Sequence, residues 1–179
     1  PEINIDPTIA GSVVGTYWFL MMIGRLCGAS IGAKVSSRAM LTVVSTVGIV
    51  LVLGAIFCAD NILVNMPVFK SDISFGFAQV PVNVMLLILC GLCTSVMWGG
   101  IFNLAVEGLG KYTAAASGLF MVMVCGGGIL PLIQGGVADF AGFLNSYWVI
   151  ALGLAYILFY AAIGSKNVNT DIPTDDYEA

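Results

Sequence analysis

Long apolar runs separated by short polar links dominate the sequence. Five stretches carry no charged side chain, at residues 7–24, 39–59, 73–106, 112–138 and 140–165. Each is as long as, or nearly as long as, the roughly 20 residues that cross about 30 Å of hydrocarbon as an α-helix. The pattern therefore predicts five membrane-spanning helices, at about residues 8–31, 39–59, 80–106, 112–138 and 145–164.

Polar links and ends make up the rest of the chain. They lie at residues 33–38, 60–79, 108–111 and 139–145, and at both termini. Pro81 is expected in the first turn of the third helix, where its missing N–H costs nothing. Strands are not expected, because the apolar runs are too long and lack the roughly 10-residue alternation of a membrane barrel. The predicted fold class is all-α, a polytopic transmembrane bundle over residues 1–165 with a polar tail over residues 166–179.

The composition also indicates a membrane protein. Hydrophobic residues make up 59% of the 179 residues and charged residues only 9%, whereas a soluble domain carries about 25% charged residues. Histidine is absent, which excludes histidine acid–base catalysis, serine activation by histidine, and histidine ligands for a metal. Six basic residues against ten acidic ones, without a basic cluster, disfavour a nucleic-acid partner.

The positions of the basic residues predict an orientation, because loops rich in lysine and arginine stay in the cytoplasm. One side of the predicted bundle holds only Lys70, and the other holds Lys34, Arg38, Lys111 and Lys166. We therefore expect the first residue outside and the tail in the cytoplasm, with the bundle in the cytoplasmic (inner) membrane. The chain begins with a proline and has no basic-then-apolar leader, so we expect a fragment or a processed chain.

Small residues gather in two of the predicted helices. A stripe that lets another backbone approach closely recurs every four residues, at Gly24, Gly28 and Gly32. The fourth helix is expected to cross its neighbours tightly and to bend, since it contains Gly127, Gly128 and Pro131. Two interpretations stay open: ordinary packing of membrane helices, or helices that move during transport.

One segment resembles a known family. Residues 97–142, MWGGIFNLAVEGLGKYTAAASGLFMVMVCGGGILPLIQGGVADFAG, resemble the major facilitator superfamily, and more narrowly its fucose/galactose/glucose:proton symporters. Those carry an IFxLxxxxLG segment, then a small-residue helix with a GGG-plus-proline centre and a turn that contains aspartate. Residues 17–28, YWFLMMIGRLCG, are similar to the eighth span of that family, which ends in a Gly-Arg pair.

The resemblance covers nearly the whole chain and implies an architecture. The five helices would be spans eight to twelve of a twelve-helix carrier, and its carboxyl terminus would lie in the cytoplasm. The implied partners are a monosaccharide, protons, the lipid bilayer and the missing amino-terminal helices of the same carrier. No cofactor or metal is implied.

Carriers of this type hold the substrate near the middle of the membrane, so we look for aromatic and amide groups inside the spans. The resemblance implies that Trp98 faces the cavity, although relatives often have a proline where Gly99 and Gly100 follow here. The alternative is a tryptophan that faces lipid at the membrane interface. Tyr17, near mid-depth, is the second aromatic candidate, because a buried phenol needs a polar partner.

Further candidates for sugar contacts are polar groups within the spans. Asn83 and Thr94 share a face of the third helix with Trp98, Asn103 lies on another flank, and Gln134 lies in the fourth helix. Each is costly in hydrocarbon without a partner, and each could instead form a helix–helix hydrogen bond. By contrast, Tyr147 and Trp148 start the fifth helix and are typical of an interfacial aromatic belt.

Charged groups and thiols within the spans are few. Arg25 either extends its guanidinium to the interface or forms a cytoplasmic gate with Glu107, which ends the third helix on the same side. Cys90 and Cys93 have the spacing of a redox or zinc motif, but an apolar helix without further ligands predicts buried thiols. Because no Asp or Glu lies at mid-depth, a proton-binding carboxylate would lie outside this chain.

The sequence therefore favours part of a secondary transporter that moves a fucose-, galactose- or glucose-type sugar by alternating access, coupled to protons. The alternative is a membrane scaffold or assembly subunit that does not transport. An intramembrane enzyme is not expected, because histidine is absent and no carboxylate pair lies within the membrane.

Overall fold

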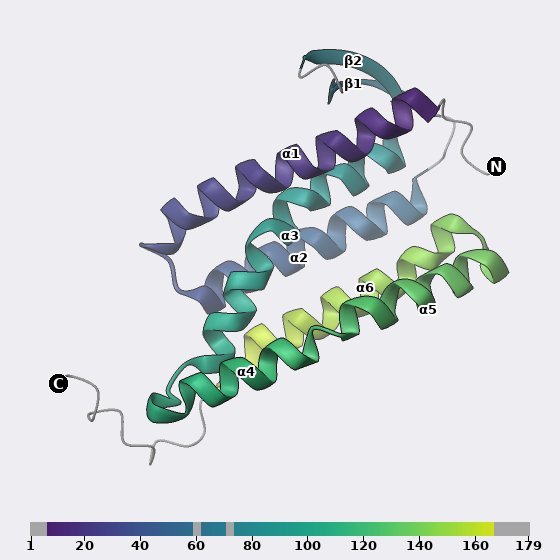
Figure 1. Ribbon diagram of the computed structural model, residues 1–179. Coiled ribbons are helices and arrows are strands. Elements are labelled where there is room, and N and C mark those ends of the chain that lie inside the picture. The colour runs from purple at the N-terminus through teal and green to yellow at the C-terminus, as the bar shows by residue number, and fades with distance from the viewer. Residues whose placement is uncertain (1–6, 59–61, 71–73, 167–179) are drawn as a thin grey trace.

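The computed structural model describes residues 7–58, 62–70 and 74–166, which form a bundle of long helices with one β-hairpin (Figure 1). The elements are α1 (Pro7–Gly32), α2 (Ser37–Phe57), β1 (Leu63–Phe69), β2 (Phe75–Pro81), α3 (Val82–Val106), the short turn η1 (Gly110–Tyr112), α4 (Thr113–Met123), α5 (Gly126–Ala141), α6 (Phe143–Phe159) and the π-helical turn η2 (Tyr160–Gly164). Among the described residues, five helical stretches are long and apolar enough to cross a membrane, with η1, α4 and α5 forming one of them. The prediction of a five-span helical bundle is confirmed.

Local chemistry explains where the helices begin and end. The side chain of Ser36 caps α2 by accepting a hydrogen bond of 3.3 Å from the backbone N–H of Ala39, which satisfies one free donor of the first turn. After α3 the chain turns through Gly108 and Gly110, and α5 ends at Gly142, which has φ of 95°. These positive φ angles are accessible to glycine at little cost, so the glycines set the ends of α3 and α5.

Helix α3 lies at the centre of the bundle. It packs against both α1 and α2, while α6 packs against α2 and α5. Figure 1 shows α1 along one side of the bundle and α4, α5 and α6 along the other, with α2 and α3 between them. We call the end with the β-hairpin and the start of α1 the hairpin end, and the end with residues 33–36 and η1 the link end.

Two hydrophobic clusters hold these elements together. The first joins α2, α3 and α6 through buried side chains that include Leu41, Val52, Met97, Ala151 and Leu154. The second joins the hairpin to α3, with Ile9, Val13 and Leu20 of α1 packed against it, and its buried members are Met66, Val68, Val80, Val84 and Ile88. In contrast, α4 and α5 contain no buried residue, so much of the surface of these two helices stays open.

The hairpin corrects one prediction from the sequence. Residues 63–69 and 75–81, expected to lie in a loop and at the start of a helix, form two antiparallel strands with Leu63 opposite Pro81 and Phe69 opposite Phe75. Pro81 therefore ends β2 and precedes α3 instead of lying in the first helical turn. The lack of the alternation seen in membrane barrels does not exclude a short hairpin that packs on a helix.

The fourth predicted span is interrupted. It is divided into α4 and α5 at Val124 and Cys125, where Gly127 N–H donates to the carbonyl of Val124 at 2.8 Å and Gly128 N–H to that of Cys125 at 2.9 Å. These bonds span three residues, as in the tighter 3-10 helix. The other predicted boundaries differ from the observed ones by a few residues, and of the predicted tail only Lys166 lies within the described residues.

Close packing of α1 on α3 yields a first test. A Cβ atom at Gly24 would collide with the Ser95 side chain and would lie 3.1 Å from the carbonyl oxygen of Leu92, whereas a Cβ at Gly11 of the same helix would meet nothing within 4 Å. Gly24→Ala should therefore lower the unfolding free energy in detergent by about 1–3 kcal/mol. Gly11→Ala should be neutral or slightly stabilising, because alanine favours a helix. Equal effects of both substitutions would contradict the packing described here.

Candidate functional site

A cleft of about 620 Å³ opens between α1 and α3 on one side and α5 and α6 on the other. Most of its lining is aliphatic, and none of its lining residues is charged. The groups that give it polar and aromatic character are Tyr17, Thr94, Gln134, Phe143 and Tyr147. A neutral, mostly apolar cavity with a few convergent polar groups is typical of a small-molecule site.

Tyr17 and Thr94 join α1 to α3 inside this cleft. Their hydroxyl oxygens lie 3.1 Å apart. The Thr94 hydroxyl also lies 3.2 Å from the carbonyl oxygen of Cys90, so it can donate to its own helix and accept from the phenol. Gly91 makes room for this pair, because a Cβ there would lie 2.9 Å from the backbone oxygen of Tyr17. Two of the candidate residues predicted from the sequence are thus brought together.

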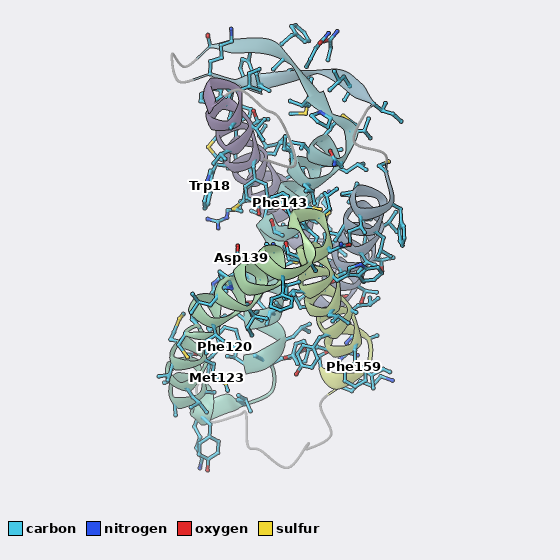
Figure 2. All side chains as sticks on the ribbon, turned by 90° about the vertical axis from the view of Figure 1, so that its right-hand side faces the viewer. Trp18, Phe120, Met123, Asp139, Phe143 and Phe159 are labelled. Atoms are coloured by element: carbon cyan, nitrogen blue, oxygen red, sulfur yellow. The ribbon has the colours of Figure 1, made fainter. Side chains whose placement is uncertain are left out.

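The opposite wall comes from α5 and α6. Gln134, a candidate predicted from the sequence, lines the cleft from α5. Tyr147 lines it from α6 and packs edge-on against Phe143, with ring centroids 5.4 Å apart. Phe143 is the first residue of α6 and is exposed, at the end of the bundle that faces the viewer in Figure 2. The two walls together present two phenols, one hydroxyl and one amide.

Tyr147 was not among the candidate site residues. Its place at the start of the fifth predicted helix favoured an interfacial belt, but the structure places its half-buried side chain in the cleft. Its neighbour Trp148 is exposed and packs against Phe57 at 6.1 Å. A signal existed in the sequence, since Phe143, Tyr147 and Ile150 follow the i, i+4, i+7 spacing of one helix face.

Trp98, the first aromatic candidate, does not line the cleft. Its ring lies 5.4 Å from that of Phe120 in α4, which also contacts Phe102 at 5.5 Å. The side chain is 47% exposed. In Figure 2, Phe120 and Met123 lie along the same side of the molecule as Trp18 of α1. Trp98 therefore belongs to an aromatic cluster at the α3–α4 contact, next to an exposed apolar face.

The two asparagine candidates also lie outside the cleft. Asn83 is fully buried at the start of α3, where its side-chain oxygen accepts a hydrogen bond of 2.8 Å from the backbone N–H of Val84. Asn103 lies near the link end and donates to the Ser37 hydroxyl of α2 at 3.5 Å. For Asn103, and for Thr94 in its contact with Tyr17, the structure contains the helix–helix hydrogen bond offered as the alternative.

The two proposed gate residues, Arg25 and Glu107, have different surroundings and do not bond to each other in this structure. Arg25 is exposed and donates to the sulfur of Met21 at 3.8 Å. Glu107 lines a second cleft of about 600 Å³ at the link end, together with Arg38 and Asn103. Arg38 donates to the carbonyl of Ser165 at 2.9 Å. No salt bridge joins Arg25 to Glu107 among the described residues, so the pairing stays a prediction about another conformation.

The small residues singled out in the sequence have different surroundings. Gly24 and Gly28 are buried against Ser95 and Val96 of α3, so a side chain at either position would collide. Gly32 is exposed, and a Cβ there would meet only the end of Met40 at 4.0 Å. A Cβ at Gly127 or Gly128 would meet nothing within 4 Å, and Pro131 is exposed in α5.

In the part of the chain that the structure describes, the cysteines form neither a disulfide nor a metal site. Cys90 and Cys93 are buried and unbridged in α3, and Cys90 lines the cleft as a small apolar group. Among the described residues, no group of three or more histidine, cysteine, aspartate or glutamate side chains is placed to hold a metal ion.

Comparison with known proteins finds similarity to sugar transporters. Glucose/galactose transporters of two Brucella abortus strains, biovar 1 strain 9-941 and strain 2308, are each 30% identical to the chain over 169 residues, which is 90% of the chain and 36% of each transporter. The L-fucose-proton symporter of Escherichia coli K12 is 33% identical over 92 residues, or 51% of the chain and 21% of that symporter. The chain thus spans little more than a third of the length of the curated transporters it matches. No protein-family profile and no solved structure matches it.

The hydrogen bond across the cleft wall can be measured directly. Tyr17→Phe and Thr94→Val should each lower stability, and a double-mutant cycle should give a coupling energy of about 0.6 kcal/mol and at most about 1.7 kcal/mol, the range for hydrogen bonds between membrane helices. Thr46→Val is the matched control, because its exposed hydroxyl bonds only to the carbonyl of Thr42 in its own helix. Unfolding in a denaturing detergent measures these energies. Strict additivity for Tyr17 and Thr94 would rule out their contact.

Proposed function

We propose that the chain, which is similar over nearly its whole length to part of glucose/galactose transporters, belongs to the major facilitator superfamily and forms the carboxyl-terminal part of a carrier for a monosaccharide. In this proposal the five spans correspond to spans eight to twelve of a twelve-helix carrier. Residues 1–165 would be part of its carboxyl-terminal transmembrane domain. The link end and the tail would face the cytoplasm, as the lysine and arginine positions favour.

The observation that carries this proposal is the neutral cleft with aromatic and hydrogen-bonding groups on both walls. A sugar has no charge, several hydroxyl groups and apolar C–H faces. Gln134 supplies donors and an acceptor for hydroxyls, and the oxygens of Tyr17 and Thr94 can accept a further hydrogen bond each. The ring of Tyr147 supplies a flat surface for a C–H face. Tyr17 lies ten residues after the start of α1, about 15 Å along the helix, which suits binding well inside the membrane.

We further propose alternating access with proton coupling. The cleft separates α1 and α3 from α5 and α6, so a shift of one wall against the other would change its access, as in other carriers. The cleft contains no carboxylate among its lining residues. The proton-binding group would therefore come from helices that accompany this chain in the complete carrier.

Gating is proposed at the link end. Glu107 shares a cleft there with Arg38, while Arg25 points to Met21 in this conformation. A rearrangement that closes the link end would have to bring Arg25 to Glu107 for the predicted gate to form. The gate proposal thus describes a second state of the bundle.

A scaffold or assembly subunit is the alternative function. The open surfaces of α4 and α5, which contain no buried residue, favour contact with further helices. These helices would belong to the same carrier in the transport proposal and to other proteins in the scaffold proposal. Transport assays on the complete protein separate the two.

The sugar proposal is tested by uptake of labelled glucose, galactose and fucose into vesicles that contain the complete carrier. We expect uptake of at least one sugar to increase with an inward proton gradient. Tyr147→Ala should raise its KM at least tenfold, since it removes both a stacking surface and a hydroxyl from the cleft. Trp148→Ala, one residue away and exposed, should stay within about twofold of the unmodified carrier. No uptake of any hexose or 6-deoxyhexose would overturn the proposal.

The gate is tested separately in the same carrier. If Arg25 and Glu107 pair in one state, Arg25→Ala and Glu107→Ala should shift the balance of inward- and outward-open forms in the same direction, and the double variant should shift it no further. Accessibility of a single reporter cysteine on each side of the membrane measures this balance. Independent, additive shifts would show that the two residues do not act as a pair.

A further inference from the structure

One edge of the β-hairpin is closed by a helix. Lys70 N–H donates to the carbonyl of Ser74 at 2.9 Å, and Val82 N–H donates to that of Ile62 at 3.0 Å. In an antiparallel ladder every second residue bonds to the neighbouring strand, and in the observed register both bonds fall on even-numbered residues. The backbone N–H and C=O groups of the even-numbered residues of β1 therefore point to β2, and those of the odd-numbered residues point away from it. The free edge of β1 would expose polar backbone groups, which is costly in an apolar environment.

The outward-facing residues of β1 reduce this cost in two ways. Pro67 has no N–H to satisfy. Phe69 N–H donates to the Thr16 hydroxyl oxygen of α1 at 2.9 Å, and that hydroxyl donates to the carbonyl of Ser12 at 2.7 Å. Thr16 is only 6% exposed, so its hydroxyl uses both its donor and its acceptor capacity in a buried place.

Gly15 and an aromatic cluster extend the contact. A Cβ at Gly15 would lie 3.3 Å from the carbonyl oxygen of Phe69, so the missing side chain lets the strand approach the helix. The rings of Phe19 and Phe69 stack at 5.2 Å with an interplanar angle of 3°. Phe75 of β2 contacts both rings edge-on, at 5.4 Å and 5.6 Å.

The hairpin thus holds one side of α1, while α3 holds another. Tyr17 follows Thr16 directly, and its hydroxyl meets Thr94 of α3 at 3.1 Å. The hairpin is itself packed on α3 through Val80, Val84 and their neighbours. The half of α1 that carries Tyr17 therefore lies between two elements that are joined to each other.

We infer that the hairpin positions the substrate cleft, and that Thr16 is a positioning residue that acts through Tyr17. By binding the free edge of β1, Thr16 fixes the rotation and depth of α1 at which the Tyr17 phenol reaches Thr94 and faces the cleft. The part of this inference that concerns sugar affinity rests on the proposed function. The part that concerns the Tyr17–Thr94 contact does not.

The test compares three variants in the complete carrier. Thr16→Val keeps the shape of the side chain but removes the acceptor, Thr16→Ser keeps the hydroxyl, and Thr46→Val removes a threonine hydroxyl that bonds only within its own helix. Thr16→Val should raise the sugar KM about fivefold, the effect of losing one net hydrogen bond, with the maximal transport rate within about twofold. Thr16→Ser should restore the KM, and Thr46→Val should leave it unchanged.

Two measurements without sugar separate this inference from the proposed function. Hydrogen exchange should show a faster amide at Phe69 in Thr16→Val, and the stability coupling between Tyr17 and Thr94 should disappear in that background. Full retention of the coupling together with a faster Phe69 amide would overturn the positioning role. If Tyr17→Phe leaves the KM unchanged while the coupling still depends on Thr16, the sugar site fails and the positioning of Tyr17 stands. Gly15→Ala, which crowds the same contact, should change the coupling in the same direction if Thr16→Val does not fold.

Discussion

Close contact between α1 and α3 is the interaction on which the rest of the structure depends. In lipid, apolar side chains gain little by leaving the solvent, so membrane helices associate through tight packing and interhelical hydrogen bonds. Gly24 and Gly28 on α1 and Gly91 on α3 supply the packing. The Tyr17–Thr94 hydrogen bond then forms within a contact that has no room for larger side chains. The position of the phenol in the cleft follows from this approach of the two helices.

The same constraint explains the hairpin. An irregular connection at the end of two membrane helices would leave backbone donors and acceptors near hydrocarbon. Strands β1 and β2 satisfy many of them by pairing with each other, and α1 then covers part of the free edge of β1. The α1 part of the cleft wall is therefore held by α3 on one side and by the hairpin on another. The other wall of the cleft is formed by α5 and α6, and α5 begins at an interruption of the helix and contains Pro131, which favours movement of that wall.

The architecture could be predicted from the sequence because it depends on length and composition. Apolar runs of about 20 residues predicted the five spans, and the Gly-Arg and GGG-proline segments pointed to sugar carriers, which the matches to glucose/galactose transporters bear out. The hairpin was missed because its residues lie in the longest connection, and its stability comes from packing against α1 and α3. A short strand that depends on a distant helix has little local signal.

The site could be predicted only in part, for a related reason. Tyr17, Thr94 and Gln134 line the cleft as polar groups within spans, but Trp98 contacts Phe120 from the neighbouring helix instead. The packing of a helix against its neighbours decides which of its faces meets a cavity. That packing depends on residues far apart in the chain, so the sequence of one helix does not reveal it. Tyr147 shows the same limit, because its position near a helix end suggested the membrane interface while packing of α6 turned it inward.

We propose that the complete carrier holds its sugar in the cleft between the α1–α3 and α5–α6 walls. The most direct measurement is an experimental structure of the complete carrier with a bound hexose or 6-deoxyhexose. If the cleft holds the sugar, sugar density should lie within hydrogen-bonding distance of Tyr17 or Gln134, with one face of the ring against Tyr147. A protein helix filling this cleft, with the sugar bound elsewhere, would contradict it.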